Sequence, residues 1–437
     1  MSSTVFKRPV LFDEALKRAV QLVRQHFASL RKPVILVRDV YGRLRIALDD
    51  RNARIDSSAL GLLVGAWSDE LGAYSPGDTA ADVFLLASHL FAPDALFSSS
   101  DIQSLPDTPD VRLLERQITG QDWLRAPFTP APKPRRATLF GIKGGVGRST
   151  ALTIWAKFLA EEHDLRVLVV DLDLESPGLG SMLLHPGQGP QFGLVDYLVE
   201  EAVGQGNEVL QRLYSTSSLV NGGKGEIIVV PAYGLEVGDY LAKLSRIYQG
   251  LPEGQGPADF AERICSAVAR IEEAFLPDVV LLDSRAGLHD IAAMAIVRMQ
   301  ALAFLFAVNT PQTFAAYRLL FDNFRTHPHR LAGFRNNLQA VAALVPDTGR
   351  AEYLESFRAN FYDLFASNIY EAELDAGEEV FNFSLEDDSA PHNPVPIHWY
   401  RWFLDFDPIN RRGAMDPKEV QAAFGTFTER ATHLLLA

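Results

Sequence analysis

Cysteine is almost absent from this sequence. Its 437 residues include one, Cys265, so no disulfide can form within the chain. Chains without disulfides suit a reducing compartment, and we expect this protein to be cytoplasmic. Cys265 lies in the helical pattern ADFAERICSAVARIEEAF. There we expect it to pack in the core rather than act as a nucleophile.

Long apolar runs are missing as well. The most apolar stretch, Met294 to Val308, is interrupted by Arg298 and Gln300. No segment resembles the run of roughly 18 apolar residues that a membrane-spanning helix needs. The first residues mix charged and apolar positions and show no secretory signal. We therefore expect no membrane insertion.

Positive charge is scarce relative to negative charge. The chain has 41 Lys and Arg against 55 Asp and Glu, which gives a formal net charge of -14. Nonspecific binding to nucleic acid needs clustered Lys and Arg to neutralise phosphates. A nucleic-acid coat is therefore disfavoured, although a local basic patch stays open. The composition, 47% hydrophobic and 22% charged, is otherwise that of a soluble globular protein.

Proline is concentrated in one segment, APFTPAPKPRR at residues 126–136, which holds four prolines. Neither a helix nor a central strand accommodates so many prolines, so we expect an extended linker with solvated basic residues. The sequence thus predicts an N-terminal α/β domain over residues 1–125, a linker over 126–136, and a larger domain over 137–437.

The part before the linker shows local patterns but no chemical motif. LFDEALKRAVQLVRQHFASL has helical periodicity, and PVILVRDVYGRLRIALD reads as two strands around a turn at Tyr41 and Gly42. AADVFLLASHLF reads as another helix. These patterns predict a small mixed α/β module whose role is open.

After the linker, short apolar runs alternate with helical segments. The runs are ATLFGI, RVLVVD, EIIVVP, DVVLLD, ALAFLFAV and QAVAALV. Continuous apolar strands separated by helices predict a mostly parallel sheet with helices on both faces. Right-handed crossovers place the carboxyl ends of such strands along one edge, where ligands bind. Residues 384–396 read as a polar, proline-rich loop.

A glycine-rich segment follows the first of these strands and precedes a helix. Its residues are Lys143, Gly144, Gly145, Val146, Gly147, Arg148, Ser149 and Thr150. Glycines let backbone N–H groups face a phosphate, the helix N-terminus adds a positive dipole end, and a hydroxyl such as that of Ser149 can ligate Mg²⁺. The common pattern has Lys at Arg148 and Gly at Ile142. A glycine-rich turn without a ligand is therefore the alternative interpretation.

Carboxylates stand at the ends of two other apolar strands. Asp171 and Asp173 follow one strand in RVLVVDLDLESPG, and Asp283 ends another in DVVLLDSRAG. A buried carboxylate needs water, a partner or a metal, and an Asp at a strand end commonly orders Mg²⁺ in phosphoryl-transfer sites. For Asp171 and Asp173, a helix cap with a turn at residues 176–178 is the alternative.

Together, KGGVGR, DLDLESPG and DSRAG resemble the deviant Walker motifs of the MinD/ParA family of P-loop ATPases (SIMIBI class), in a branch with Arg in the loop. The resemblance covers about residues 138–313. It implies ATP and Mg²⁺ as cofactors, with residues 144–150 around the phosphates and Ser149, Asp171 and Asp283 at the metal. It further implies catalytic roles for Asp173, which would orient the attacking water, and for the signature lysine, Lys143.

The resemblance implies a slowly hydrolysing ATPase switch that forms a homodimer or engages a protein partner. A nucleotide-binding scaffold without turnover is one alternative, suggested by Arg148. An ATP-dependent ligase or synthetase on the same fold is another. GTP stays open, because Asp347 follows the strand after which related proteins often place an adenine-reading Asn. Arg285 replaces a family proline, and it is open whether it faces phosphate, a partner subunit or solvent.

Overall fold

The computed structural model describes most of the chain in two compact units, Met1–Gln121 and Asp122–Ala437. The division lies just before the boundary expected at residue 125, because Trp123, at the end of the 3-10 turn η3 (Gln121–Trp123), packs against Phe140 and Phe324. The described residues are 9–26, 30, 34–51, 57–99, 101–105, 108–128, 135–250, 259–326, 331–371, 380–411 and 413–437.

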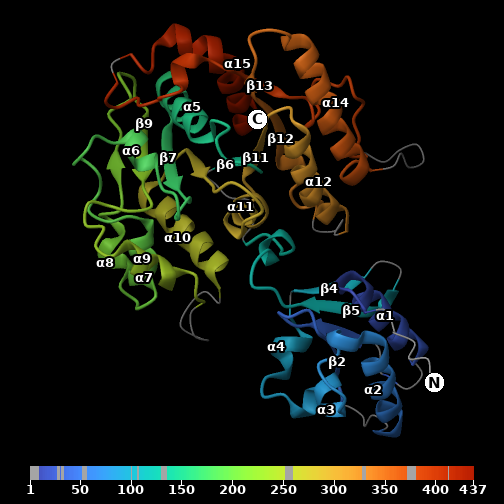
Figure 1. Ribbon diagram of the computed structural model, residues 1–437. Helices are drawn as coiled ribbons and strands as arrows, with labels where there is room; N and C mark the ends of the chain where they lie inside the picture. Colours follow the sequence, from blue (N-terminus) through green and yellow to red (C-terminus); the bar gives the residue numbers. More distant parts are fainter. Residues whose placement is uncertain are drawn as a thin grey trace, which may run out of the picture. The chain divides into compact units, whose positions relative to one another are not determined.

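The N-terminal unit contains a five-stranded mixed sheet (Figure 1). Its strands are β1 (Val34–Arg38), β2 (Leu44–Leu48), β3 (Phe84–Leu86), β4 (Ile102–Leu105) and β5 (Thr108–Glu115), in the order β3-β2-β1-β5-β4. The expected hairpin of β1 and β2 is present, and Gly42 in its turn has a φ of +87°. The helices and turns are α1 (Phe12–Gln25), α2 (Ser57–Leu71), η1 (Gly72–Tyr74), α3 (Ala80–Val83), η2 (Ala87–His89) and α4 (Pro93–Phe97).

The expectation of one helix over AADVFLLASHLF is wrong. Thr79 caps α3 through a capping box with Asp82, and the helix ends at Val83. The following residues, Phe84–Leu86, form β3, which pairs in parallel with Ile46–Leu48 of β2. A short apolar run fits a helix or a strand equally well by periodicity, and here the open edge of β2 decides between them.

The larger unit is built on an eight-stranded sheet with the order β13-β12-β11-β6-β10-β7-β9-β8. Every neighbouring pair is parallel except β8 and β9. The fold class is therefore as expected: a mostly parallel sheet flanked by helices, preceded by a small α/β unit. The strands are β6 (Arg135–Gly141), β7 (Arg166–Asp171), β8 (Ser215–Thr216), β9 (Glu226–Val230), β10 (Val279–Asp283), β11 (Leu302–Ala307), β12 (Leu338–Val345) and β13 (Val395–His398).

Two segments expected to be irregular contribute to this sheet. Arg135 and Arg136, the end of the expected linker, begin β6. The Arg136 guanidinium is buried and donates to both carboxylate oxygens of Glu272 at 2.6 Å, so the solvated position expected for it is wrong. A buried guanidinium is tolerated because a carboxylate compensates its charge. Linker residues 129–134 lie outside the described residues. The loop expected over 384–396 ends in β13, where Val395 pairs with Val341.

Helices cover both faces of the larger sheet (Figure 1). One face carries α5 (Arg148–Glu162) and α15 (Pro417–Leu436). The remaining helices and turns of this unit are α6 (Leu179–Leu183), α7 (Leu194–Glu201), α8 (Gly206–Leu210), α9 (Tyr240–Ile247), α10 (Phe260–Phe275), α11 (Asp290–Ala293), the π-helical turn η4 (Met294–Arg298), α12 (Pro311–Thr326), η5 (Arg335–Asn337), α14 (Arg350–Asn368) and η6 (Arg401–Phe403).

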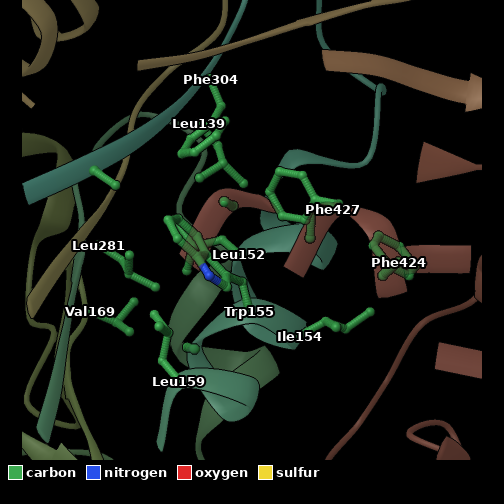
Figure 2. Packing of buried hydrophobic residues seen from close by; sticks show 14 of the residues in the cluster. Leu139, Leu152, Ile154, Trp155, Leu159, Val169, Leu281, Phe304, Phe424 and Phe427 are labelled. Atoms are coloured by element: carbon green, nitrogen blue, oxygen red, sulfur yellow. The ribbon is translucent and has the colours of Figure 1, made fainter. Parts of the chain in front are cut away.

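Trp155 fixes α5 between the sheet and α15 (Figure 2). Its ring makes edge-on contacts with Phe304 of β11 and Phe427 of α15, and its Nε1 donates to the Thr432 hydroxyl at 2.9 Å. A large aromatic side chain buried in this way contributes strongly to packing and finds a partner for its one polar atom. The helix that begins at the glycine-rich loop is therefore held rigidly against the core.

Cys265 lies in the core, as expected. It is buried on α10, and burial raises the pKa of its thiol to about 12, so the reactive thiolate is disfavoured. Among the described residues, none of the helices combines the length and the apolar character that crossing a bilayer demands.

Candidate nucleotide and metal site

The glycine-rich loop joins the end of β6 to the start of α5. Gly145 and Gly147 have φ angles of +75° and +80°, a region that side chains other than glycine rarely adopt. Val146 is buried in the core beneath α5 and anchors the loop, whereas Lys143 and Gly144 are exposed. Ile142, which departs from the common pattern, is also buried and packs in the core on the opposite face. The loop is therefore a fixed structure with an exposed rim.

The backbone of this loop offers unused donors. Among the described residues, no N–H group from Lys143 to Thr150 donates a hydrogen bond to the protein. Arg148, Ser149 and Thr150 form the first turn of α5, where N–H groups have no partner within the helix. Converging N–H groups at a helix N-terminus favour a bound anion, so the loop fits the phosphates of a nucleotide.

Arg148 connects this loop to the neighbouring strand end. Its Nη1 donates to the Ser284 carbonyl at 2.6 Å, just after β10. A guanidinium has five N–H donors, so donors remain for a phosphate oxygen. A lysine at this position has a single compact ammonium group and lacks the planar fork of donors that lets a guanidinium bond two separate acceptors.

Two buried carboxylates lie side by side at the same edge of the sheet. Asp171 ends β7 and Asp283 ends β10, and the two are partners in the parallel register of these strands. They are 1% and 4% exposed, so neither is solvated. The Ser149 hydroxyl donates to Asp283 Oδ2 at 2.8 Å. The fold therefore brings Ser149 into contact with Asp283 and places Asp171 beside it.

Burial shifts the pKa of both carboxyl groups upward. For Asp171, burial raises the pKa well above 3.8, and the adjacent Asp283 raises it further. For Asp283, burial raises the pKa to about 6, although Arg148 and the hydrogen bond from Ser149 oppose the shift. Adjacent buried carboxylates destabilise each other's charged form unless a cation lies nearby.

Asp171 stabilises the loop that follows β7, which contains Asp173. Asp171 accepts hydrogen bonds from the Asp173 and Leu179 N–H groups at 3.1 and 3.3 Å, so it caps both ends of residues 172–178. The N-cap of the helix that follows, α6, is Gly178, and no side chain caps it. Asp173 Oδ1 is buried and has no hydrogen-bond partner among the described residues. A buried, unpaired carboxylate oxygen fits a water molecule or the hydration shell of a cation.

The donor set fits Mg²⁺ only together with a phosphate. Within the described part of the chain, no three His, Cys, Asp or Glu side chains gather as a metal cluster. Mg²⁺ in nucleotide sites is held by one or two carboxylates together with waters and phosphate oxygens. Two carboxylates and a hydroxyl, from Asp171, Asp283 and Ser149, meet that requirement.

Two tyrosines and Arg285 contact the segment that follows Asp173. Arg285 forms an ion pair with Glu175. Tyr248 donates to Glu175 Oε1 at 2.5 Å, and Tyr240 donates to the Leu174 carbonyl at 2.6 Å. Tyr248 lies 73 residues after Glu175 in the sequence, and Tyr240 lies 66 residues after Leu174. No sequence motif indicates contacts between residues this far apart.

Asp283 makes the stability of the ligand-free protein depend on pH. The pKa of its carboxyl group is about 6 in the folded state, above the ordinary 3.8. The contribution of this group to the free energy of unfolding is therefore fully present below about pH 4 and is lost as the pH rises through 6. We expect Asp283→Asn to remove that loss and to raise the free energy of unfolding at pH 8 by roughly 1–3 kcal/mol. Urea unfolding without Mg²⁺ or nucleotide at pH 5 and pH 8 measures the effect. A variant less stable than the native protein at pH 8 contradicts it.

Comparison with known proteins finds no matching family model and no matching curated protein. Solved structures with a similar chain arrangement include a ParA-family ATPase from Chlorobium tepidum, at 14% identity over 69% of this chain and 99% of that one, with a TM-score of 0.44. The MinC:MinD complex of Aquifex aeolicus aligns at 14% identity over 68% and 96%, with a TM-score of 0.41. Cobyrinic acid a,c-diamide synthase of Mycobacterium smegmatis, with a bound ATP analogue and magnesium, aligns at 20% identity over 57% and 88%, with a TM-score of 0.36. Similarities this distant assign no activity to this chain.

Proposed function

We propose that this protein binds Mg-ATP and hydrolyses it slowly, as an ATPase switch of the MinD/ParA type that dimerises or engages a protein partner. One observation carries the proposal. The loop from Lys143 to Thr150 has unused backbone donors, and it stands beside the hydrogen-bonded pair of Ser149 and Asp283. Groups suited to phosphate binding and groups suited to metal binding thus occur together at one sheet edge.

The chain's own residues would divide the work of phosphoryl transfer. Backbone N–H groups of residues 144–150 bind the phosphates, and Arg148 neutralises their charge. Ser149, Asp171 and Asp283 would hold Mg²⁺, which when bound would compensate the charge on the phosphate oxygens. Asp173, with its unpaired Oδ1, orients the attacking water. Catalysis of this kind depends on positioning and charge rather than on a covalent intermediate.

A nucleotide-binding scaffold without turnover is the second candidate. The hydrogen bond from Arg148 to the Ser284 carbonyl favours it, because a restrained guanidinium adapts poorly to charge that develops in the transition state. Single-turnover hydrolysis measured beside equilibrium binding of Mg-ATP separates the two. Cleavage to ADP and phosphate supports the ATPase, whereas tight binding without cleavage supports the scaffold.

Lys143 provides a test of dimerisation. Its side chain is exposed and forms no ion pair with any described residue, so it is available to the nucleotide of a facing subunit. We expect Mg-ATP to increase the dimer fraction and Lys143→Ala to remove the increase, because a twofold dimer would pair both sites. Light scattering with and without Mg-ATP measures this. Lys157→Ala is the matched control, since Lys157 pairs with Glu161 within α5. A native protein that stays monomeric in saturating Mg-ATP contradicts the proposal.

A further inference from the structure

We propose that Arg285 and Glu175 are positioning residues. They hold the Asp173 loop, residues 172–178, in a fixed position relative to the glycine-rich loop, residues 143–150. The proposal rests on the hydrolysis proposed above and extends it. Arg285 comes from the segment after β10, and Glu175 comes from the segment after β7. Their ion pair is a side-chain connection between the two segments that flank the buried carboxylates.

The first half of the Asp173 loop is held through its backbone. Leu172 N–H donates to the Asp283 carbonyl at 3.0 Å, and Asp173 N–H donates to Asp171. The Leu174 carbonyl accepts from the Tyr240 hydroxyl at 2.6 Å. The next residue, Glu175, is held through its side chain, which contacts both Arg285 and the Tyr248 hydroxyl.

The segment that carries Arg285 is in turn bound at two points, once to the glycine-rich loop and once to the end of β6 just before it. Ser284, the residue before Arg285, accepts from Arg148 at 2.6 Å. Gly287, two residues after it, donates its N–H to the Gly141 carbonyl at 3.0 Å. A phosphate that attracts the Arg148 guanidinium therefore acts on the backbone next to Arg285. Through the ion pair, that displacement reaches the loop that carries Asp173.

The ion pair of Arg285 and Glu175 is partly exposed, so its effect on turnover can be distinguished from an effect on folding stability. The Arg285 and Glu175 side chains are 39% and 26% exposed. Ion pairs exposed to this extent contribute little to folding stability. A displacement of about 1 Å in a group that orients a reactant, by contrast, can reduce turnover on the order of 10²-fold. The signature we expect is a large effect on turnover with little effect on nucleotide affinity or unfolding.

Charge reversal tests this signature. We expect Arg285→Glu and Glu175→Arg each to lower single-turnover hydrolysis of Mg-ATP about 10-fold or more, with nucleotide affinity changed less than about 3-fold. The double swap, Arg285→Glu with Glu175→Arg, restores turnover to within about 3-fold of native, because the pair forms again with its charges exchanged. Arg246→Glu is the control, since the guanidinium of Arg246 bonds within α9, to the Ala242 carbonyl. A double variant as slow as the single variants overturns the proposal.

Hydrogen exchange separates this proposal from the hydrolysis on which it rests. In the nucleotide-free protein, amides of residues 172–179 are expected to exchange faster in each single variant, and more slowly in the double swap than in either single variant. This readout does not require turnover. A native protein that binds Mg-ATP without cleaving it overturns the proposed hydrolysis alone. Single variants that exchange like the native protein overturn the role of the pair.

Discussion

Replacing Asp283 with Asn is expected to abolish the Mg²⁺ dependence of ATP binding and to lower turnover on the order of 10³-fold, since a metal ion supplies several kcal/mol to phosphoryl transfer. Asp283 is buried, and it accepts from the Ser149 hydroxyl at 2.8 Å. An amide keeps the shape and can still accept that hydrogen bond, but it lacks the charge that holds a divalent cation. Asp171→Asn is expected to act in the same direction, because Asp171 is the register partner of Asp283.

Titration with a fluorescent ATP analogue, with Mg²⁺ and with EDTA, measures this loss. Asp278→Asn is the matched control: Asp278 comes just before β10, at the opposite end of the strand from Asp283, and accepts from the Arg166 N–H. We expect the control to behave as the native protein does. If Asp283→Asn retains the full Mg²⁺ effect, the metal is not held at this strand end.

Arg148→Ala is expected to weaken nucleotide binding about 10²-fold. The side chain supplies a permanent charge next to the phosphates, and hydrogen bonds to charged groups are worth about 1.5–3 kcal/mol each. Removing it also leaves the Ser284 carbonyl without the donor that it has at 2.6 Å. Arg135→Ala is the control, because Arg135 begins β6, at the end of that strand far from the glycine-rich loop.

Arg148→Lys is expected to retain binding and to raise turnover several-fold. Lysine keeps the charge, and its compact ammonium follows charge that develops in the transition state more easily than a guanidinium held on Ser284. Single-turnover hydrolysis beside equilibrium binding measures both quantities. If Arg148→Lys cleaves ATP more slowly than the native protein, the arginine is part of the catalytic design rather than a clamp.

The arrangement of the candidate site was predictable from sequence where it depends on local spacing. The glycine-rich loop, Ser149 inside the next helix, and Asp171 and Asp283 at strand ends all follow from short motifs on a parallel sheet, because such a sheet brings its strand ends to one edge. The structure places Ser149 on Asp283 and sets Asp171 beside it.

What the sequence did not predict depends on contacts far apart in the chain. Arg136 was expected to be a solvated linker residue. It is buried instead, because Glu272, 136 residues later, compensates its charge. Phe84–Leu86 looked helical, but the free edge of β2 makes it a strand. The partner of Arg285 likewise depends on how two loops meet, which no local pattern encodes.

A crystal structure of the protein with Mg²⁺ and a non-hydrolysable ATP analogue tests the central proposal most directly. We expect the phosphates inside the loop from Lys143 to Thr150, with Ser149, Asp171 and Asp283 around one Mg²⁺ at about 2.0–2.1 Å or through one water. A nucleotide bound elsewhere, or carboxylates of Asp171 and Asp283 more than about 8 Å from the metal, would contradict it, because one bridging water extends the reach only modestly.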